Sequence, residues 1–188
     1  MLILTLKNNY RAFGVFDGHG KNGDIIAQFT ADNLVKCIKK QIDNMNAKGK
    51  IWIYSWLYIK FLDPKITIDI FEQVQNDIKN QIIKKGFEDL SNLLEQEEYD
   101  SEKSGTTANV VLICKNIMTC INVGDSRAML GTFHNFTKTW KPIVLSRDHK
   151  PDIKTEHDRI EAAGGYVHFQ KNSAGIRVNL NCSNILYL

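Results

Sequence analysis

The chain has 188 residues, of which 43% are hydrophobic and 24% charged, and its formal net charge is +3. This length is typical of one globular domain or a large part of one, and the composition excludes a wholly disordered, collagenous or mucin-like chain. The small charge excess indicates no nucleic-acid partner. The most hydrophobic stretch, residues 51–62, is too short for a membrane-spanning helix, which needs about 20 residues, so no membrane span is predicted.

The chain contains four cysteines, which are Cys37, Cys114, Cys120 and Cys182. No two of them form a C-x-x-C pair, so neither a zinc site nor a disulfide scaffold is predicted, and we interpret them as reduced thiols. The apolar residues 1–6 make a poor secretion signal, because Lys7 ends the run and no cleavage site follows. The sequence therefore predicts a soluble monomer of the cytoplasm or nucleus.

The first half of the chain predicts one strand and two helices. A buried strand is expected over 12–16, followed by a loop at 17–24 that holds three glycines. Apolar residues spaced three and four apart predict a helix over 25–45, capped by Asp24, and a second over 67–95. Gly86 lies inside the second helix, and we expect it to bend or break that helix.

The second half has the alternating pattern of strands, with turns expected at 115–116 and 124–126. Strands are predicted at 107–114, 117–123, 127–131, 143–145, 167–169 and 175–180. The first three should form an antiparallel meander. A short helix is expected over 154–163, ended by Gly164 and Gly165. Because helices and strands do not alternate one for one, we predict an α+β fold with helices on antiparallel sheet, not a doubly wound parallel sheet.

The loop at Asp17 carries the clearest chemical signal. A carboxylate follows a buried strand, Gly18 leaves its own carbonyl accessible, and His19 supplies an imidazole within three residues. This set suits a hard divalent cation with a neighbouring proton donor. A glycine-rich turn whose aspartate caps the next helix explains the local pattern equally well. The loop lacks the oxygen ligands of an EF-hand and the Gly-Lys-Ser/Thr of a P-loop.

Three separated blocks carry a family resemblance. They are FGVFDGHG at 13–20, SGTTA at 104–108 with NVGDSRA at 122–128, and SRDHKP at 146–151 with Glu156, residues 159–160 and residues 164–165. A shorter block, IRV, follows at 176–178. In this order the blocks resemble the metal-dependent protein phosphatases of the type 2C (PPM) class. The resemblance covers about 13–178, except for a patch at 51–65, and suggests that residues 1–188 are a single partial phosphatase domain.

The resemblance implies a fold, a reaction and a set of cofactors. The fold would be two antiparallel β-sheets packed together and flanked by helices, an α/β/β/α sandwich, here incomplete. Two Mg²⁺ or Mn²⁺ ions, with a third and weaker position, would activate a water that hydrolyses phosphoserine or phosphothreonine in phosphoprotein substrates.

Site residues follow from the same resemblance by position. Asp17 would bridge both ions, the Gly18 carbonyl would bind one of them, and His19 would protonate the leaving oxygen. Asp125 would hold the weaker ion, although a turn aspartate bonded to its own backbone is the alternative. The cluster 148–150 is interpreted as scaffold, and the pair Glu156–Arg159 as a surface ion pair.

Some parts of the family pattern have no counterpart. Before Asp17 the family carries an acidic metal-binding pair and a phosphate-binding arginine. Arg11 is in this segment, but the sequence around it does not match that of the family arginine. After residue 178 the family supplies two more metal-binding aspartates. We therefore expect weak binding of the ion pair and uncovered sheet edges. Two alternatives follow: a non-catalytic phosphoprotein-binding relative, or a fragment without independent function. The patch at 51–62 could be an insertion, a buried helical turn or a translated intron.

Overall fold

The structure is a computed structural model that describes residues 2–6, 10–47, 64–97, 99, 104–114, 117–167, 170–172 and 175–177. The features predicted at 51–63, 115–116, 168–169 and 178–180 lie outside these residues. The chain divides into two compact units, each considered by itself: Met1–Ala31 with Asp100–Leu188, and Asp32–Tyr99.

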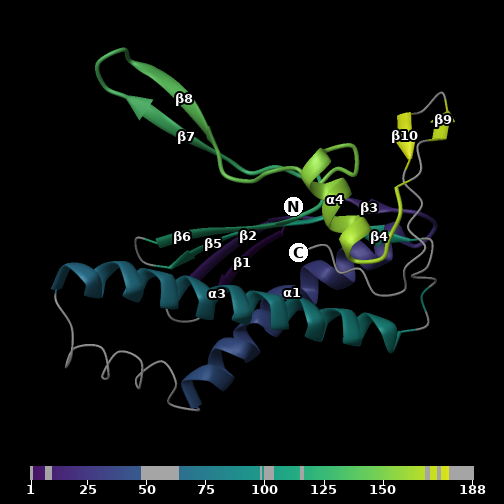
Figure 1. The fold of residues 1–188 in the computed structure, drawn as a ribbon, viewed down its shortest axis with the longest axis horizontal. Helices are drawn as coiled ribbons and strands as arrows, with labels where there is room; N and C mark the ends of the chain where they lie inside the picture. The colour runs from purple at the N-terminus through teal and green to yellow at the C-terminus, as the bar shows by residue number, and fades with distance from the viewer. Residues whose placement is uncertain are drawn as a thin grey trace. The chain divides into compact units, whose positions relative to one another are not determined.

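A four-stranded antiparallel sheet is the centre of the first unit (Figure 1). Its strands, in spatial order, are β1 (Leu2–Leu6), β2 (Tyr10–Val15), β5 (Ala108–Cys114) and β6 (Ile117–Val123). Register places Gly14 opposite Val110 and Val110 opposite Ile121, so small and β-branched residues share one buried face. The predicted strands at 12–16, 107–114 and 117–123 are confirmed to within a few residues.

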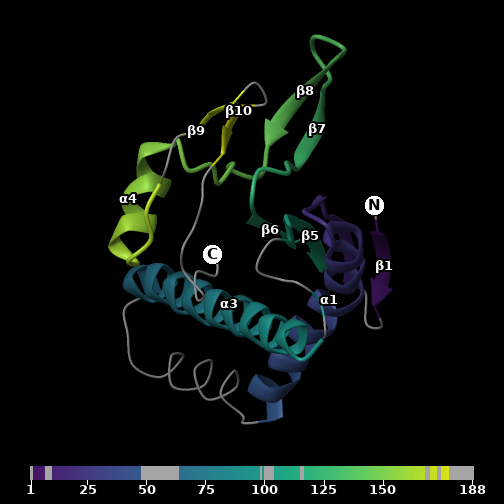
Figure 2. The same cartoon turned by 90° about the vertical axis from the view of Figure 1, so that its right-hand side faces the viewer.

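Three two-stranded ribbons complete the sheet structure of the described residues (Figures 1 and 2). They are β3 (Gly18–His19) with β4 (Gly105–Thr106), β7 (Met129–His134) with β8 (Thr139–Val144), and β9 (Gln170–Asn172) with β10 (Gly175–Arg177). The predicted three-strand meander is therefore wrong at its last step, because β7 pairs with β8 and not with β6. Gly124, at φ +94°, turns the chain out of the sheet at this point.

The helices among the described residues are α1 (Gly23–Ala47), α3 (Pro64–Glu95) and α4 (Lys154–Ala162). α4 ends as predicted: Gly164 has φ +83°, its N–H donates to the Glu161 carbonyl, and the Gly165 N–H donates to the Ile160 carbonyl at 2.9 Å. This pair of bonds is the Schellman arrangement that satisfies the last carbonyls of a helix. In the described part of the chain, no helix is long and apolar enough to cross a membrane.

In the second unit, Gly86 lies inside a continuous α3, so the expected break in this helix is wrong. A Cβ atom placed on Gly86 would lie 2.7 Å from Ile38 Cγ1, which means that the two helices approach closely at this point. The glycine is therefore explained by packing rather than by helix termination. Among the residues of this unit whose burial the structure describes, the buried hydrophobic ones are Leu34, Val35, Cys37, Ile38, Phe87 and Leu90.

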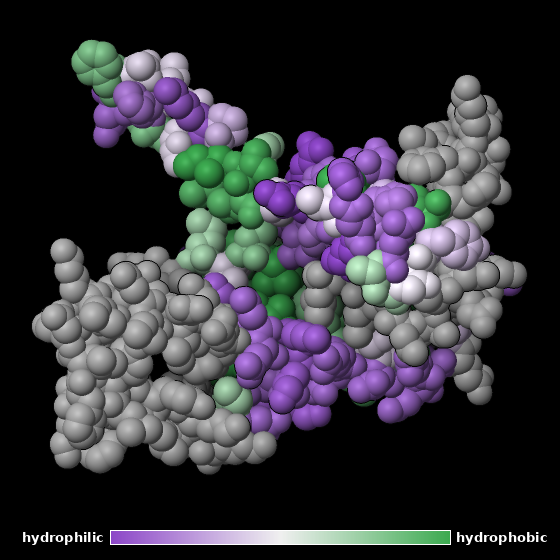
Figure 3. All heavy atoms as spheres, in the orientation of Figure 1, coloured by the Kyte–Doolittle hydropathy of each residue, from purple (hydrophilic) through white to green (hydrophobic). Residues whose placement is uncertain are grey.

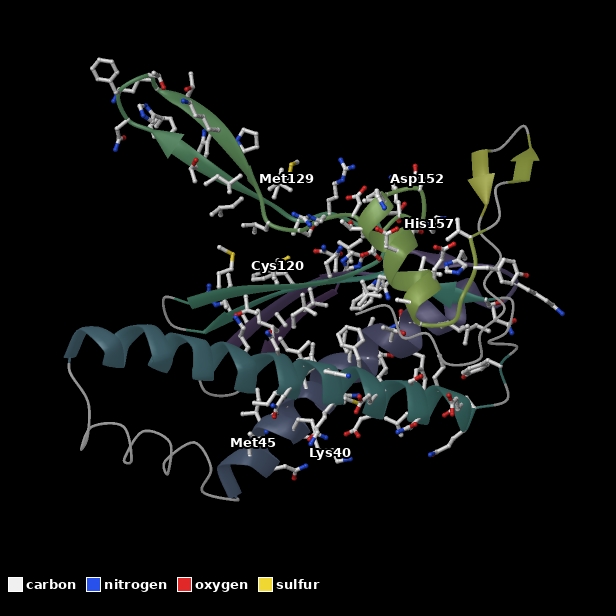
Figure 4. All side chains as sticks on the ribbon, viewed as in Figure 1. Lys40, Met45, Cys120, Met129, Asp152 and His157 are labelled. Atoms are coloured by element: carbon white, nitrogen blue, oxygen red, sulfur yellow. The ribbon has the colours of Figure 1, made fainter. Side chains whose placement is uncertain are left out.

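The ribbon of β7 and β8 exposes many apolar side chains. Met129 and Val144 face each other across the strands, as do Phe133 and Trp140, whose ring centroids lie 5.3 Å apart. Trp140 is 70% exposed, and Figure 3 shows hydrophobic residues gathered at the base of the ribbon, where Figure 4 labels Met129. The described residues leave this apolar face of the ribbon uncovered. The first unit thus combines antiparallel sheet with helices. The predicted α+β class is confirmed.

Candidate active site

The backbone of Asp17 is held on both sides by one residue. β2 ends at Val15, and two residues later the Asp17 N–H donates to Thr107 Oγ1 at 3.0 Å. The Thr107 N–H donates in turn to the Asp17 carbonyl at 2.9 Å. The side chain of Asp17 remains exposed, so its carboxylate is free to face a ligand from a fixed main chain. A ligand can reach this carboxylate, as the metal-binding role predicted for Asp17 needs.

Close backbone contacts shape the loop that follows Asp17. A Cβ atom on Gly23 would lie 2.7 Å from the Gly18 carbonyl carbon, and a Cβ on Gly18 would overlap the Gly23 carbonyl oxygen. The Asn22 N–H donates to Ser104 Oγ at 3.0 Å and fixes the same loop from the other side. Side chains at Gly18 and Gly23 would therefore prevent the loop from closing onto the start of α1.

His19 lies against a glycine on the neighbouring strand. It pairs with Gly105 across β3 and β4, and a Cβ on Gly105 would lie 2.9 Å from both Cε1 and Nε2 of the imidazole. Gly105 thus makes room for the ring, which is exposed beside Asp17 and Gly18. The three predicted residues of the loop are adjacent and all exposed.

The turn that carries Asp125 is held by two asparagines. Buried Asn109 donates from Nδ2 to Asn122 Oδ1 at 2.7 Å and to the Ser126 carbonyl at 3.1 Å. Asn122 then donates to the carbonyls of Gly124 and Arg147, at 3.0 and 2.7 Å. Such bonds fix a turn at the end of a strand because they satisfy its buried polar groups.

Asp125 itself is exposed, and the partner described for its carboxylate is a lysine. Its Oδ2 lies 3.8 Å from Lys150 Nζ. Lys150 Nζ is also 3.2 Å from Asp148 Oδ2, so this lysine lies between two carboxylates. Any cation that binds Asp125 therefore meets a carboxylate already paired with a positive charge.

The block 148–150 makes the contacts of a scaffold. Asp148 accepts hydrogen bonds from Arg127 Nε and Nη2 at 2.6 and 2.8 Å, and chiefly for this reason its pKa is lowered from 3.8 to about 2. The same bond raises the pKa of Arg127. The His149 N–H donates to the Gly124 carbonyl at 3.0 Å. Glu156 and Arg159 form the predicted ion pair at 2.7 Å, although both are partly buried.

Thr107 joins the two predicted parts of the site. Its hydroxyl oxygen lies 2.7 Å from Ser126 Oγ, next to Asp125, while it also accepts from the Asp17 N–H. Sequence reasoning recognised the blocks that contain Thr107 and Ser126 but gave neither residue a role. Asp17 and Thr107 are 90 positions apart in the sequence, so no local sequence pattern predicts their contact.

The oxygen donors fit a hard divalent ion in kind but not in number. A carboxylate and a backbone carbonyl are the ligands that Mg²⁺ and Mn²⁺ prefer. Within the described ranges, however, no group of three or more His, Cys, Asp or Glu residues is placed to hold a metal ion. The described residues alone therefore give an incomplete ligand set.

The fold matches that of a known class of phosphatase. The crystal structure of serine-threonine phosphatase 2C from Toxoplasma gondii aligns with a TM-score of 0.60 at 22% identity, and the match covers 90% of this chain and 49% of that one. The sequence matches the family Protein phosphatase 2C over residues 3–181, and the chain belongs to this family.

Curated relatives agree with the family match. The chain is 35% identical over 168 residues to Protein phosphatase 2C homolog 2 of Aspergillus fumigatus, covering 89% of this chain and 30% of the relative. It is 32% identical over 188 residues to Probable protein phosphatase 2C 4 of Paramecium tetraurelia, covering 98% and 51%. The chain thus spans about a third to a half of the length of these relatives.

Proposed function

We propose that this chain is part of an enzyme that hydrolyses phosphoserine and phosphothreonine in proteins with the help of Mg²⁺ or Mn²⁺. The observation that carries the proposal is the loop Asp17-Gly18-His19, where an exposed carboxylate, a backbone carbonyl and an imidazole adjoin on a main chain fixed by Thr107. Membership of the Protein phosphatase 2C family supports the same reaction.

Each residue of the loop has a role in this proposal. Asp17 would bridge two ions, the Gly18 carbonyl would bind one of them, and Asp125 would hold a third and weaker one. Bound ions lower the pKa of a water molecule and offset the charge of a phosphoryl group. His19 would donate a proton to the serine or threonine oxygen that leaves, because it is exposed and follows Asp17 by two residues in the same loop.

We further propose that residues 1–188 form one partial phosphatase domain. The family match runs over 3–181 and therefore includes both compact units. Its partners would be phosphoproteins. The protein would be a monomer. Within the described residues, Cys37 and Cys120 are free thiols, which is consistent with the cytoplasm or nucleus, where thiols stay reduced.

The incomplete ligand set favours a second candidate function. A relative that binds phosphoproteins without hydrolysing the phosphate needs no complete pair of metal sites. The absence of a three-residue ligand group from the described residues is the observation in its favour.

Phosphate release from a phosphothreonine peptide, measured with and without Mn²⁺, tests the proposed hydrolysis. Release should require Mn²⁺ and should be abolished in Asp17→Asn, because this change removes a ligand charge at the strand end. Asp24→Asn is the matched control, since Asp24 is also exposed and lies at the start of α1. Equal release from wild type and Asp17→Asn would contradict the proposal. Peptide capture without release, unchanged in Asp17→Asn, would support the binding module instead.

A further inference from the structure

The hydroxyl group of Thr107 lies where three segments of the first unit meet. Its oxygen accepts a hydrogen bond from the Asp17 N–H at 3.0 Å and lies 2.7 Å from Ser126 Oγ. The backbone N–H of Thr107 donates to the Asp17 carbonyl at 2.9 Å. Thr107, directly before β5, thus contacts both the loop that follows β2 and the turn at Asp125.

The contacts to Asp17 act on its backbone and leave its carboxylate unengaged. Both polar groups of the Asp17 main chain bond to Thr107, so the direction in which the side chain leaves the loop depends on this pair of bonds. The Gly18 carbonyl follows in the same peptide chain and depends on them as well. Loss of the Thr107 hydroxyl would leave the Asp17 N–H without its acceptor, so that one of the two bonds from Thr107 to the Asp17 main chain remains.

The methyl group of Thr107 contacts the turn that carries Asp125. A Cβ atom on Gly124 would lie 2.7 Å from Thr107 Cγ2, so the methyl group packs directly over this glycine. The hydroxyl group reaches Ser126, on the other side of Asp125. Threonine supplies both contacts, whereas serine lacks the methyl group and valine lacks the hydroxyl group.

We propose that the hydroxyl pair of Thr107 and Ser126 positions Asp17 and couples it to the Asp125 turn. Thr107 is a positioning residue here, because its described contacts are with protein atoms. The inference rests on the proposed function for the statement that these aspartates bind metal. It predicts that the two candidate metal positions respond together when either hydroxyl is removed.

Two substitutions separate positioning from simple packing. Thr107→Val keeps the methyl contact with Gly124 and removes the hydroxyl, whereas Thr107→Ser keeps the hydroxyl and removes the methyl. Mn²⁺ affinity of the 188-residue chain, titrated to millimolar concentration by water-proton relaxation, should fall about tenfold or more in Thr107→Val. In Thr107→Ser it should stay within about threefold of wild type. Urea unfolding of the same variants reports stability separately. Affinity that follows stability, and not the hydroxyl, would overturn the proposal.

Amide hydrogen exchange in the metal-free chain gives a second, independent readout. Thr107→Val should speed exchange of the Asp17 amide, and Ser126→Ala should speed exchange of the same amide through the Thr107 hydroxyl. Unchanged exchange at Asp17 in Thr107→Val would overturn the positioning role. Unchanged exchange at Asp17 in Ser126→Ala would overturn the coupling.

Asp17→Asn distinguishes this inference from the proposed function. If Asp17→Asn leaves Mn²⁺ affinity unchanged, or if wild type binds no Mn²⁺ at millimolar concentration, the proposed metal site fails while the exchange data still decide on the positioning role. If Asp17→Asn abolishes binding and Thr107→Val binds like wild type, the metal site stands and the inference fails.

Discussion

Arg127 and Asp148 form a two-pronged ion pair, with Nε and Nη2 of the arginine at 2.6 and 2.8 Å from the two carboxylate oxygens. The Asp148 side chain is only 11% exposed. The pair joins the chain just before β7 to the segment before α4, two segments that also meet through Gly124 and His149. A planar guanidinium that bonds both oxygens of a carboxylate fixes the relative orientation of the two segments.

This ion pair predicts a loss of stability in acid. The Arg127 hydrogen bond lowers the pKa of Asp148 from 3.8 to about 2, so the folded chain holds this proton less tightly than the unfolded chain. The stabilisation is therefore complete above about pH 4 and is lost as the pH falls from about 4 through about 2. Asp148→Asn should be less stable than wild type at pH 7. The difference should shrink over that window in urea unfolding curves.

Asp152→Asn is the control for the acid prediction. Asp152, labelled in Figure 4, is exposed and lies in the same loop before α4. Its substitution should leave the unfolding midpoint at pH 7 unchanged. Wild type and Asp148→Asn midpoints that run parallel from pH 7 to pH 2 would contradict the role given to the ion pair.

Lys150 should weaken cation binding at Asp125. Its Nζ lies 3.8 Å from Asp125 Oδ2, and this positive charge opposes any metal ion that approaches the same carboxylate. Lys150→Met should therefore increase Mn²⁺ affinity a few-fold, since an exposed pair at about 4 Å is worth on the order of 1 kcal/mol. The measurement is a Mn²⁺ titration at low ionic strength.

Lys150→Arg keeps the charge and should bind Mn²⁺ like wild type. Adding Asp125→Asn to Lys150→Met should remove the gain, because the gain depends on the Asp125 carboxylate. A gain that persists without this carboxylate would show that Lys150 acts elsewhere.

Periodicity predicted the helices and most strands of the described residues, because these depend on local apolar spacing. β1 was not predicted as a strand: its sequence LILTL was considered only as a signal segment, and its pairing with β2 defines it. The pairing of β7 with β8 depends on the hairpin turn at 135–138, where Lys138 has φ +52°, and no turn was predicted at these residues.

The chemistry of the candidate site was predictable only where residues are neighbours in sequence. Asp17, Gly18 and His19 are consecutive, so their adjacency follows from the chain itself. The contacts of Thr107 with Asp17 and Ser126 arise from strand pairing across 90 and 19 positions. Side-chain bonds of this kind require the register of the folded sheet, which a single sequence does not give.

The chain should bind the proposed ion pair weakly. Two divalent ions need several carboxylates to offset four positive charges, and the described residues bring no three ligands together. Isothermal titration of the 188-residue chain with Mn²⁺ should show no saturable uptake of two ions in the low micromolar range. Tight binding of two ions would contradict this prediction and would require ligands outside the described residues.

Gly18→Ala should destabilise the first unit. A Cβ at this position would overlap the Gly23 carbonyl oxygen, a backbone atom that cannot move aside as the end of a flexible side chain can. We expect a loss of about 1–3 kcal/mol in the free energy of unfolding, measured in urea. Gly164→Ala is a useful comparison: it has φ +83° but no heavy atom within 4 Å of the added Cβ, so backbone strain alone should cost about 1 kcal/mol.

Gly86→Ala should destabilise the second unit although alanine is the better helix former. In an exposed helix interior this change gains about 1 kcal/mol, but here the new Cβ would lie 2.7 Å from Ile38 Cγ1 and 3.1 Å from Ile38 Cα. The clash should outweigh the gain, giving a net loss of about 1–2 kcal/mol in urea unfolding. Lys85→Ala, at an exposed neighbouring position, should be nearly neutral.

A double-mutant cycle with Ile38→Ala identifies the cause of that loss. Removing Cγ1 of Ile38 creates space for the alanine, so Gly86→Ala should cost less in the Ile38→Ala background than in wild type. The contact with Ile38 Cα remains, so the relief should be partial. If Gly86→Ala lowers the free energy of unfolding equally in the two backgrounds, the side chain of Ile38 is not the reason that glycine is required. The close approach of the two helix backbones would then be the reason.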